Sequence, residues 1–240
     1  MKANSYQVSA IGTDLLQPGQ NLGEFVARHL TGDYTPRDGL VLAVTSKIVS
    51  LAEGRLVPTA SITKKELVQK EADVYLGDIG YGCYLTIKHG LLIPSAGIDE
   101  SNSGGTQYIL YPEKPFESAR LLHRSLSEEF GIKNLGIILT DSHTTPLRRG
   151  VTGIALAYWG MRGVRNLVGK PDLFGKPLQY TRVNIVDALA AAAVLAMGEA
   201  DERRPLALIE GADVEFVSNT DPKEVEIPLE EDLYRPMLLR

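Results

Sequence analysis

The sequence predicts an α+β fold in which mixed sheets are flanked by helices. Two observations lead to this prediction. First, the expected strands are joined both by tight hairpins and by helices, so a regular βαβ alternation does not fit. Second, the usual nucleotide signatures do not occur: Gly169–Pro177 has the wrong spacing for a P-loop, and no Gly-x-Gly-x-x-Gly follows a strand. P-loop and dinucleotide-binding folds are therefore not expected.

The elements of the first half follow from hydrophobic spacing and from turn residues. Apolar residues three and four apart indicate helices, and short apolar or alternating runs indicate strands. In order, these patterns predict a strand over 6–13, a helix over 22–30, a buried strand over 39–44 that turns into a helix at 45–50, and an amphipathic helix over 62–72.

The second half starts with an expected hairpin that turns at His89-Gly90. Gly131 and Gly198 are expected to end two helices, and Asp187 is expected to cap the start of the second. The irregular stretch 163–177 is interpreted as a functional loop. The predicted elements are strands over 83–88, 91–95, 106–111, 135–140, 151–159 and 206–209, and helices over 115–130 and within 183–197.

Composition limits the classes of function. The 25 basic and 30 acidic side chains give a net charge of −5, so no overall field attracts nucleic acid or an anionic membrane. The longest apolar stretch, 188–197, is about half of what spans a bilayer, and the amino terminus lacks signal-peptide features. The expected location is the cytoplasm. We expect one domain over residues 1–240, with two interleaved lobes as the alternative.

Two aspartates follow apolar runs. Asp99 closes the run 91–98 and Asp141 closes the run 135–140, and a small polar segment follows each acid. A short apolar run that ends at an acid predicts a buried strand that delivers a carboxylate to the rim of a sheet. For each acid a purely structural interpretation stays open. Asp99 could belong to a capped turn, and the cluster 140–150 that contains Asp141 could be a polar surface loop.

A third acid, Glu199, comes just after a predicted helix. A carboxylate at that position is disfavoured by the helix dipole unless a cation lies nearby. Together with Asp99 and Asp141 it suggests an oxygen-rich site for hard divalent cations. The single cysteine, Cys83, is predicted to be a core thiol, and His29 and His123 are expected to be structural or solvated.

Taken in order, several segments resemble the coenzyme F420-0:L-glutamate ligase family, the gamma-glutamyl ligases that extend the tail of a deazaflavin coenzyme. The matching segments cover about four fifths of the chain and are specific as a set. They are Val44–Ser50 with Ala52–Arg55, Ser95–Asn102, Thr140–Ser142 through Arg148–Gly150, Gly169–Lys176, Val186–Ala192 and Met197–Asp201.

The resemblance implies a homodimeric ligase that uses GTP and two divalent cations, Mg²⁺ or Mn²⁺, on a fold unlike the P-loop and ATP-grasp architectures. By position, Asp99 and Asp141 would bind one cation, and Ser142 and Glu199 would help to bind the other. The nucleotide would contact residues from four segments: Thr13, Asp14, Leu15 and Leu16, then Ser46 and Lys47, then Asn102, and then Met197, Gly198 and Asp201.

Substrate handling would fall to cationic side chains. Lys47 would offset the charge of the nucleotide, and Arg148 or Arg149 could hold a substrate carboxylate through two parallel hydrogen bonds. The implied route phosphorylates the acceptor carboxylate and lets the amine of L-glutamate attack the acyl phosphate.

Three departures from the family pattern keep alternatives open. Leu51 stands where the family usually has Lys, Ala188 where it has Glu, and Ser142-His143 where it has Thr with Asn or Phe. One alternative is the same chemistry on a folate-type or other glutamylated acceptor. Others are a nucleotide-binding module without catalysis and a metal-dependent phosphohydrolase.

Overall fold

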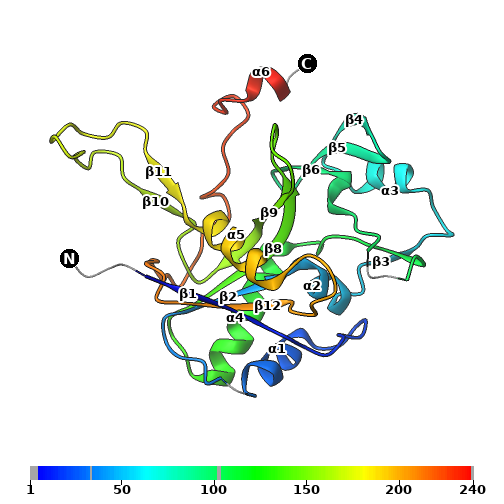
Figure 1. Ribbon diagram of the computed structural model, residues 1–240, viewed down its shortest axis with the longest axis horizontal. Helices are drawn as coiled ribbons and strands as arrows, with labels where there is room; N and C mark the ends of the chain where they lie inside the picture. Colours follow the sequence, from blue (N-terminus) through cyan, green and yellow to red (C-terminus); the bar gives the residue numbers. More distant parts are fainter. Residues whose placement is uncertain (1–4, 33, 102–103, 239–240) are drawn as a thin grey trace.

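A five-stranded sheet lies at the centre of the molecule (Figure 1). The structure is a computed structural model, and it describes residues 5–32, 34–101 and 104–238. In the strand order β1-β12-β2-β8-β9, β2 and β8 run parallel, and the other neighbours are antiparallel. The strands are β1 (Gln7–Ile11), β2 (Leu40–Thr45), β8 (Leu135–Thr144), β9 (Val151–Trp159) and β12 (Leu206–Glu210).

The central strands carry apolar side chains on both faces. Along β2, Leu42 and Val44 contribute to one core, while Val41 and Ala43 contribute to the other. All four are inaccessible to solvent. Continuous apolar runs of this kind are typical of strands that are covered on both sides.

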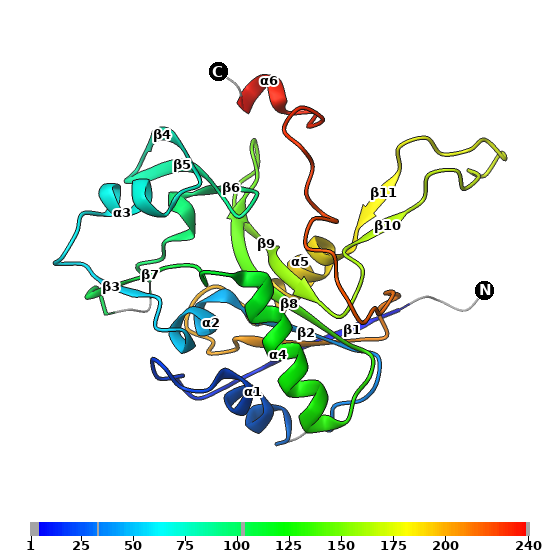
Figure 2. The same cartoon turned by 180° about the vertical axis from the view of Figure 1, so that it is seen from behind.

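Helices cover both faces of the sheet, which gives three layers (Figure 2). One face packs against α1 (Leu22–Leu30), α2 (Ser46–Ala52) and α4 (Pro115–Phe130), and the other against α5 (Ile185–Met197). Helix α5 approaches β9 closely, because a Cβ at Gly153 would lie 2.4 Å from the Ala190 carbonyl oxygen. The missing side chain of Gly153 therefore allows this tight packing.

Residues 53–111 form a small lobe beside this main body (Figure 1). Its core consists of five buried residues: Leu67, Val68, Ile98, Tyr108 and Leu110. A capping box between Thr63 and Glu66 begins its helix. The elements of the lobe are β3 (Leu56–Pro58), α3 (Lys64–Glu71), β4 (Val74–Gly80), β5 (Cys83–Lys88), β6 (Leu91–Pro94), a 3-10 turn (Ser95–Gly97) and β7 (Gln107–Ile109).

An arm extends away from the main body (Figure 1). We use this name for residues 164–184, in which β10 (Val164–Asn166) pairs with β11 (Arg182–Asn184). Leu173 and Phe174 near its tip are 98% and 95% exposed. The segment after β12 then returns along the main body to α6 (Arg235–Leu238).

Most predicted elements are confirmed, and so is the α+β class. The bounds of α1 and α4 agree with the sequence prediction, and Gly131 ends α4 in the left-handed conformation. The His89-Gly90 hairpin and the direct turn from β2 into α2 are also present. None of the helices in the described ranges is long and apolar enough to cross a membrane.

Several predictions about local structure are wrong. Neither aspartate closes a strand: β8 continues to Thr144, and a 3-10 turn separates β6 from Asp99. Asn184 caps α5, and Asp187 lies inside the first turn, where it accepts a hydrogen bond from the Ala155 N–H at 2.9 Å.

The prediction for Cys83 is also wrong, and several short elements were not predicted. Cys83 is half-buried at the start of β5, next to a turn, so it is not a core thiol. The hydrophobic patterns also gave no prediction of β3, β4, β10, β11 and α6. These elements are short or contain glycines and bulges, and they lack the hydrophobic periodicity on which the predictions depended.

Candidate functional site

Strand ends from distant parts of the chain meet at one edge of the central sheet. The register aligns Ile11 with Leu206 and Leu206 with Val44, and Thr45 lies beside Thr140. The segments that follow β1 and β2, that precede β12, and that continue β8 therefore come together. Helix α5 also ends there.

A cleft of about 800 Å³ opens at this edge, between the main body and the small lobe. Twelve of the predicted site residues line it, from five separate segments. They are Thr13, Asp14, Leu15, Leu16, Lys47, Asp99, Asp141, Ser142, Met197, Gly198, Glu199 and Asp201.

Asp141 lies on the main-body wall of the cleft, just after an irregularity in the pairing of β8 with β9 at Leu139 and Thr140. Such bulges redirect side chains next to functional sites. The Tyr111 hydroxyl donates a short hydrogen bond to Asp141 Oδ2. Burial raises the pKa of Asp141 to about 6, although the Tyr111 hydrogen bond acts to lower it.

Asp99 lies on the small-lobe wall. Its backbone pairs with Ile109, with N···O distances of 2.9 and 2.8 Å, which fixes the segment after the 3-10 turn. Lys47 Nζ lies 2.5 Å from Asp99 Oδ2, and the Ser101 N–H donates to Oδ1 at 2.6 Å. Burial acts to raise the pKa of Asp99, but the hydrogen bond and charge of Lys47, together with the hydrogen bonds from Ser101, hold this pKa below its usual value.

Glu199 follows α5, and Gly198 ends that helix with a φ of 86°. Partial burial raises the pKa of Glu199, whereas a hydrogen bond from the Ser142 hydroxyl lowers it. The charge of Asp99 adds to the rise in the pKa of both Glu199 and Asp141. The charge of Asp99 therefore acts on both of the other carboxylates.

The donor chemistry fits hard divalent cations that share ligands with a substrate. Within the described ranges, no three His, Cys, Asp or Glu side chains are grouped closely enough to hold an ion by themselves. Mg²⁺ commonly takes only one or two carboxylates from the protein and completes its shell with phosphate oxygens and water. Asp99, Asp141, Ser142 and Glu199 offer oxygens of this kind around one cleft.

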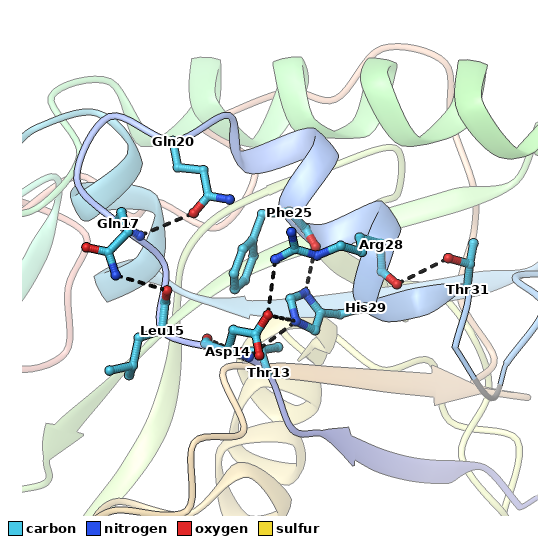
Figure 3. A network of polar contacts seen from close by, with 9 residues as sticks. All are labelled: Thr13, Asp14, Leu15, Gln17, Gln20, Phe25, Arg28, His29 and Thr31. Atoms are coloured by element: carbon cyan, nitrogen blue, oxygen red, sulfur yellow. Dashed lines mark hydrogen bonds and ion pairs between the residues drawn. The ribbon is translucent and has the colours of Figure 1, made fainter.

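Helix α1 fixes the rim segment that contains Asp14 (Figure 3). The ring of His29 bonds the Phe25 carbonyl oxygen through Nδ1 at 2.8 Å, which leaves Nε2 to accept the Asp14 N–H at 3.2 Å. The Arg28 guanidinium also lies 3.3 Å from Asp14 Oδ2. His29 is thus structural, as predicted, and it anchors a wall of the cleft.

Three predicted residues do not line the cleft, and a fourth is not described by the structure. Ser46 is buried at the start of α2, and Asn102 lies outside the described residues. Arg148 and Arg149 are exposed on the connection between β8 and β9. That connection starts next to Thr144, which lines the cleft.

Three residues that matter for the geometry were not predicted from the sequence. Arg203 and Arg204 line the cleft and add positive charge to it. Their only signal was their position shortly after the acidic segment 199–202. Tyr111 gave no local signal at all, because its hydroxyl meets Asp141 only through the tertiary fold.

The chain is similar to one family of known proteins over most of its length. A family model described as F420-0:Gamma-glutamyl ligase matches residues 10–211. This range includes all residues that line the cleft.

Individual relatives are similar over most of their length. Coenzyme F420:L-glutamate ligase of Methanocaldococcus jannaschii is 33% identical, and the alignment covers 95% of this chain and 97% of that protein. The protein of the same name from Methanopyrus kandleri is 32% identical, and the alignment covers 87% of this chain and 88% of that protein. The protein of the same name from Archaeoglobus fulgidus is 30% identical, and the alignment covers 95% of this chain and 96% of that protein.

Proposed function

The chain belongs to the F420-0:gamma-glutamyl ligase family, and from this premise we propose that it joins L-glutamate to the carboxylate of a deazaflavin precursor at the expense of GTP. The observation that carries the proposal is the convergence of Asp99, Asp141 and Glu199 around one cleft that Lys47 and two arginines also reach. The family assignment implies a fold distinct from P-loop and ATP-grasp ligases.

The proposed reaction has two steps. An oxygen of the acceptor carboxylate attacks the γ-phosphorus of GTP, so that a P–O bond forms to the acceptor and the bond to GDP breaks. The amine of glutamate then attacks the acyl carbon, inorganic phosphate leaves, and the amine loses a proton as the amide forms. Catalysis of this kind depends on positioning and on electrostatic stabilisation, and it requires no protein nucleophile.

In this proposal, oxygen ligands hold two divalent cations, Mg²⁺ or Mn²⁺. Asp99 and Asp141 would hold one, and Ser142 and Glu199 would contribute to the other. The cations, when bound, would neutralise phosphate charge during phosphoryl transfer. The raised pKa of Asp141 supports this role, since a buried carboxylate near other acids is stabilised by a cation.

Nucleotide contacts would come from the rim of the cleft. Lys47 forms an ion pair with Asp99 and could exchange this partner for a phosphate. Residues 13–16 and 197–201 would enclose the rest of the nucleotide, with Arg203 and Arg204 as further counter-charges. Arg148 and Arg149 would hold the acceptor from the exposed end of the β8–β9 connection.

A screen of possible acceptors tests the proposed function directly. The full chain is incubated with GTP, L-glutamate, Mn²⁺ and either the deazaflavin precursor or a folate, and products are weighed by mass spectrometry. The proposal predicts addition of glutamate to the deazaflavin precursor together with one phosphate released per bond. Addition to the folate alone would favour the other acceptor, for which the cleft-lining pair His143 and Thr144 offers a different wall from the family pattern.

Two further outcomes would contradict the ligase proposal. Nucleotide binding without phosphate release, whatever the acceptor, would favour a non-catalytic module, and the apolar Leu51 in the cleft wall is consistent with that outcome. Phosphate release that does not depend on glutamate would indicate a phosphohydrolase.

We also propose that the chain forms a homodimer through the arm. Leu173, Phe174 and Tyr180 are 98%, 95% and 83% exposed, and large apolar side chains exposed together are typical of interfaces. Light scattering should give twice the chain mass of 26.2 kDa for the natural protein and the single mass for a variant with Leu173→Ser and Phe174→Ser. An unchanged mass in the variant would exclude the arm as the contact.

A further inference from the structure

Tyr111 connects the small lobe to the main body at the cleft. It follows β7 of the lobe, and it is only 4% exposed. Its hydroxyl donates to Oδ2 of Asp141, which belongs to β8 of the main body. The residue that constrains this carboxylate therefore comes from the opposite wall of the cleft.

The ring of Tyr111 has little room to move. A Cβ at Gly97 would lie 2.1 Å from Cζ of the ring, so only glycine is compatible with this packing. The ring also stacks on His89, with centroids 6.3 Å apart, and it shares a small core with Ile93 and Leu156. Contacts on several sides thus fix the position of the hydroxyl.

The backbone of Tyr111 is fixed as well. Arg55 Nε donates to the Tyr111 carbonyl oxygen at 3.0 Å, and the same guanidinium forms an ion pair of 2.8 Å with Glu71 of α3. Because Arg55 joins this carbonyl to the lobe helix, the lobe holds both the ring and the main chain of Tyr111. A change in the lobe is therefore transmitted to the Asp141 carboxylate.

We propose that Tyr111 is a positioning residue that orients the Asp141 carboxylate for divalent-cation binding, with Gly97 providing the space for its ring. This inference rests on the proposed function, because it assumes that Asp141 is a cation ligand. A carboxylate has four lone-pair directions, and the hydrogen bond to Oδ2 selects which of them face the cleft. When a residue that hydrogen-bonds to a metal ligand is lost, metal affinity typically falls 10–100-fold.

The test is the variant Tyr111→Phe, which keeps the ring and removes only the hydroxyl. We expect its Mn²⁺ dissociation constant, measured by electron paramagnetic resonance of free Mn²⁺ in the presence of GDP, to rise about 10-fold or more. Ligation should fall at limiting Mn²⁺ and recover at high Mn²⁺. Gly97→Ala should weaken Mn²⁺ binding in the same way, since its Cβ displaces the ring.

Tyr158→Phe is the matched control. Tyr158 is also buried and also donates a hydrogen bond, to the Asp221 carbonyl oxygen at 3.0 Å, but it lies in the core beneath α5. It should leave Mn²⁺ affinity unchanged. Asp141→Asn completes the set, because adding Tyr111→Phe to Asp141→Asn should weaken Mn²⁺ binding no further if Tyr111 acts through Asp141.

Two results would overturn the inference. One is a folded Tyr111→Phe protein with the Mn²⁺ affinity of the natural protein. The other is an equal additional loss of affinity when Tyr111→Phe is introduced into Asp141→Asn. These results differ from failure of the proposed function, in which the natural protein itself would neither bind Mn²⁺ with GDP nor ligate glutamate.

Discussion

The two walls of the cleft are built differently, yet each wall contributes a side chain that binds an aspartate of the opposite wall. The main-body wall carries Asp141 on a strand of a sheet that is buried on both faces, and Tyr111 of the lobe bonds it. The lobe wall carries Asp99 in front of a five-residue core, and Lys47 of the main body pairs with it.

The two contacts across the cleft also differ in exposure. Lys47 and Asp99 are 28% and 34% exposed at their side chains, so solvent screens their ion pair, whereas Tyr111 is buried. The difference indicates that the Lys47–Asp99 ion pair can exchange when a charged substrate binds, whereas the Tyr111–Asp141 hydrogen bond keeps the two walls in a fixed relative position. The following experiments test whether the two contacts differ in this way.

The largest effect is expected from Asp141→Asn. The change removes one carboxylate charge of the main-body wall, from a residue proposed to bind a cation directly, so we expect ligation to fall on the order of 1,000-fold. The melting temperature should not fall, because burial of this carboxylate disfavours its charged form. Steady-state kinetics at saturating Mn²⁺ and a thermal melt check both points, and full activity in the folded variant would exclude Asp141 as a cation ligand.

A second experiment separates the cores behind the two walls. Leu67→Ala in the lobe and Leu126→Ala in α4 each remove a buried leucine, and each should cost about 3 kcal/mol of unfolding free energy in its own region. Because Ile98 of the lobe core precedes Asp99, Leu67→Ala should weaken Mn²⁺ binding more than Leu126→Ala. Urea titration measures the unfolding free energy of both variants, and Mn²⁺ titration measures their Mn²⁺ affinity. Equal Mn²⁺ affinities would contradict the prediction that the lobe core supports the site more directly than α4.

A smaller effect is expected from Lys47→Gln on stability. An ion pair that is partly exposed contributes about 1 kcal/mol or less, so the unfolding free energy should change by no more than that. Denaturant titration at low and at high salt checks the prediction. A loss of several kcal/mol would show that this contact, too, is a fixed part of the fold.

The smallest effect concerns pH and two partly buried histidines, one in the main body and one in the lobe. Burial lowers the pKa of His123 in α4 and of His89 in the lobe. A histidine whose folded pKa is depressed takes up its proton more readily when unfolded, so stability should fall as pH drops below about 6.5 and level off below the folded pKa. His123→Gln should flatten this slope in urea titrations between pH 7 and 5, and an unchanged slope would contradict the assignment.

Local signals explain which parts of the fold could be predicted. Helix α4 has proline at its start and Gly131 at its end, and both act within a single turn, so its bounds were read correctly. The position of Asp99 could not be read, because Ala96 takes a positive φ of 53° in the 3-10 turn that precedes it, and no side-chain pattern signals this.

The candidate site shows the same limit. Its acids were found because short-range patterns placed them after apolar runs, and the family resemblance supplied the order of the segments. Tyr111 was missed because its role depends on a contact between residues thirty positions apart and on the missing side chain of Gly97. Contacts between sequence-distant residues carry no periodic signal.

The parallel pairing of β2 with β8 has a kinetic consequence. Leu40 lies opposite Leu135, and the whole small lobe and α4 lie between these strands in the chain. Closing so long a loop is entropically costly, and folding slows as contacts join more distant residues. The hairpins of the lobe involve only near neighbours in sequence, so they can form early, before the central pair of strands closes the sheet.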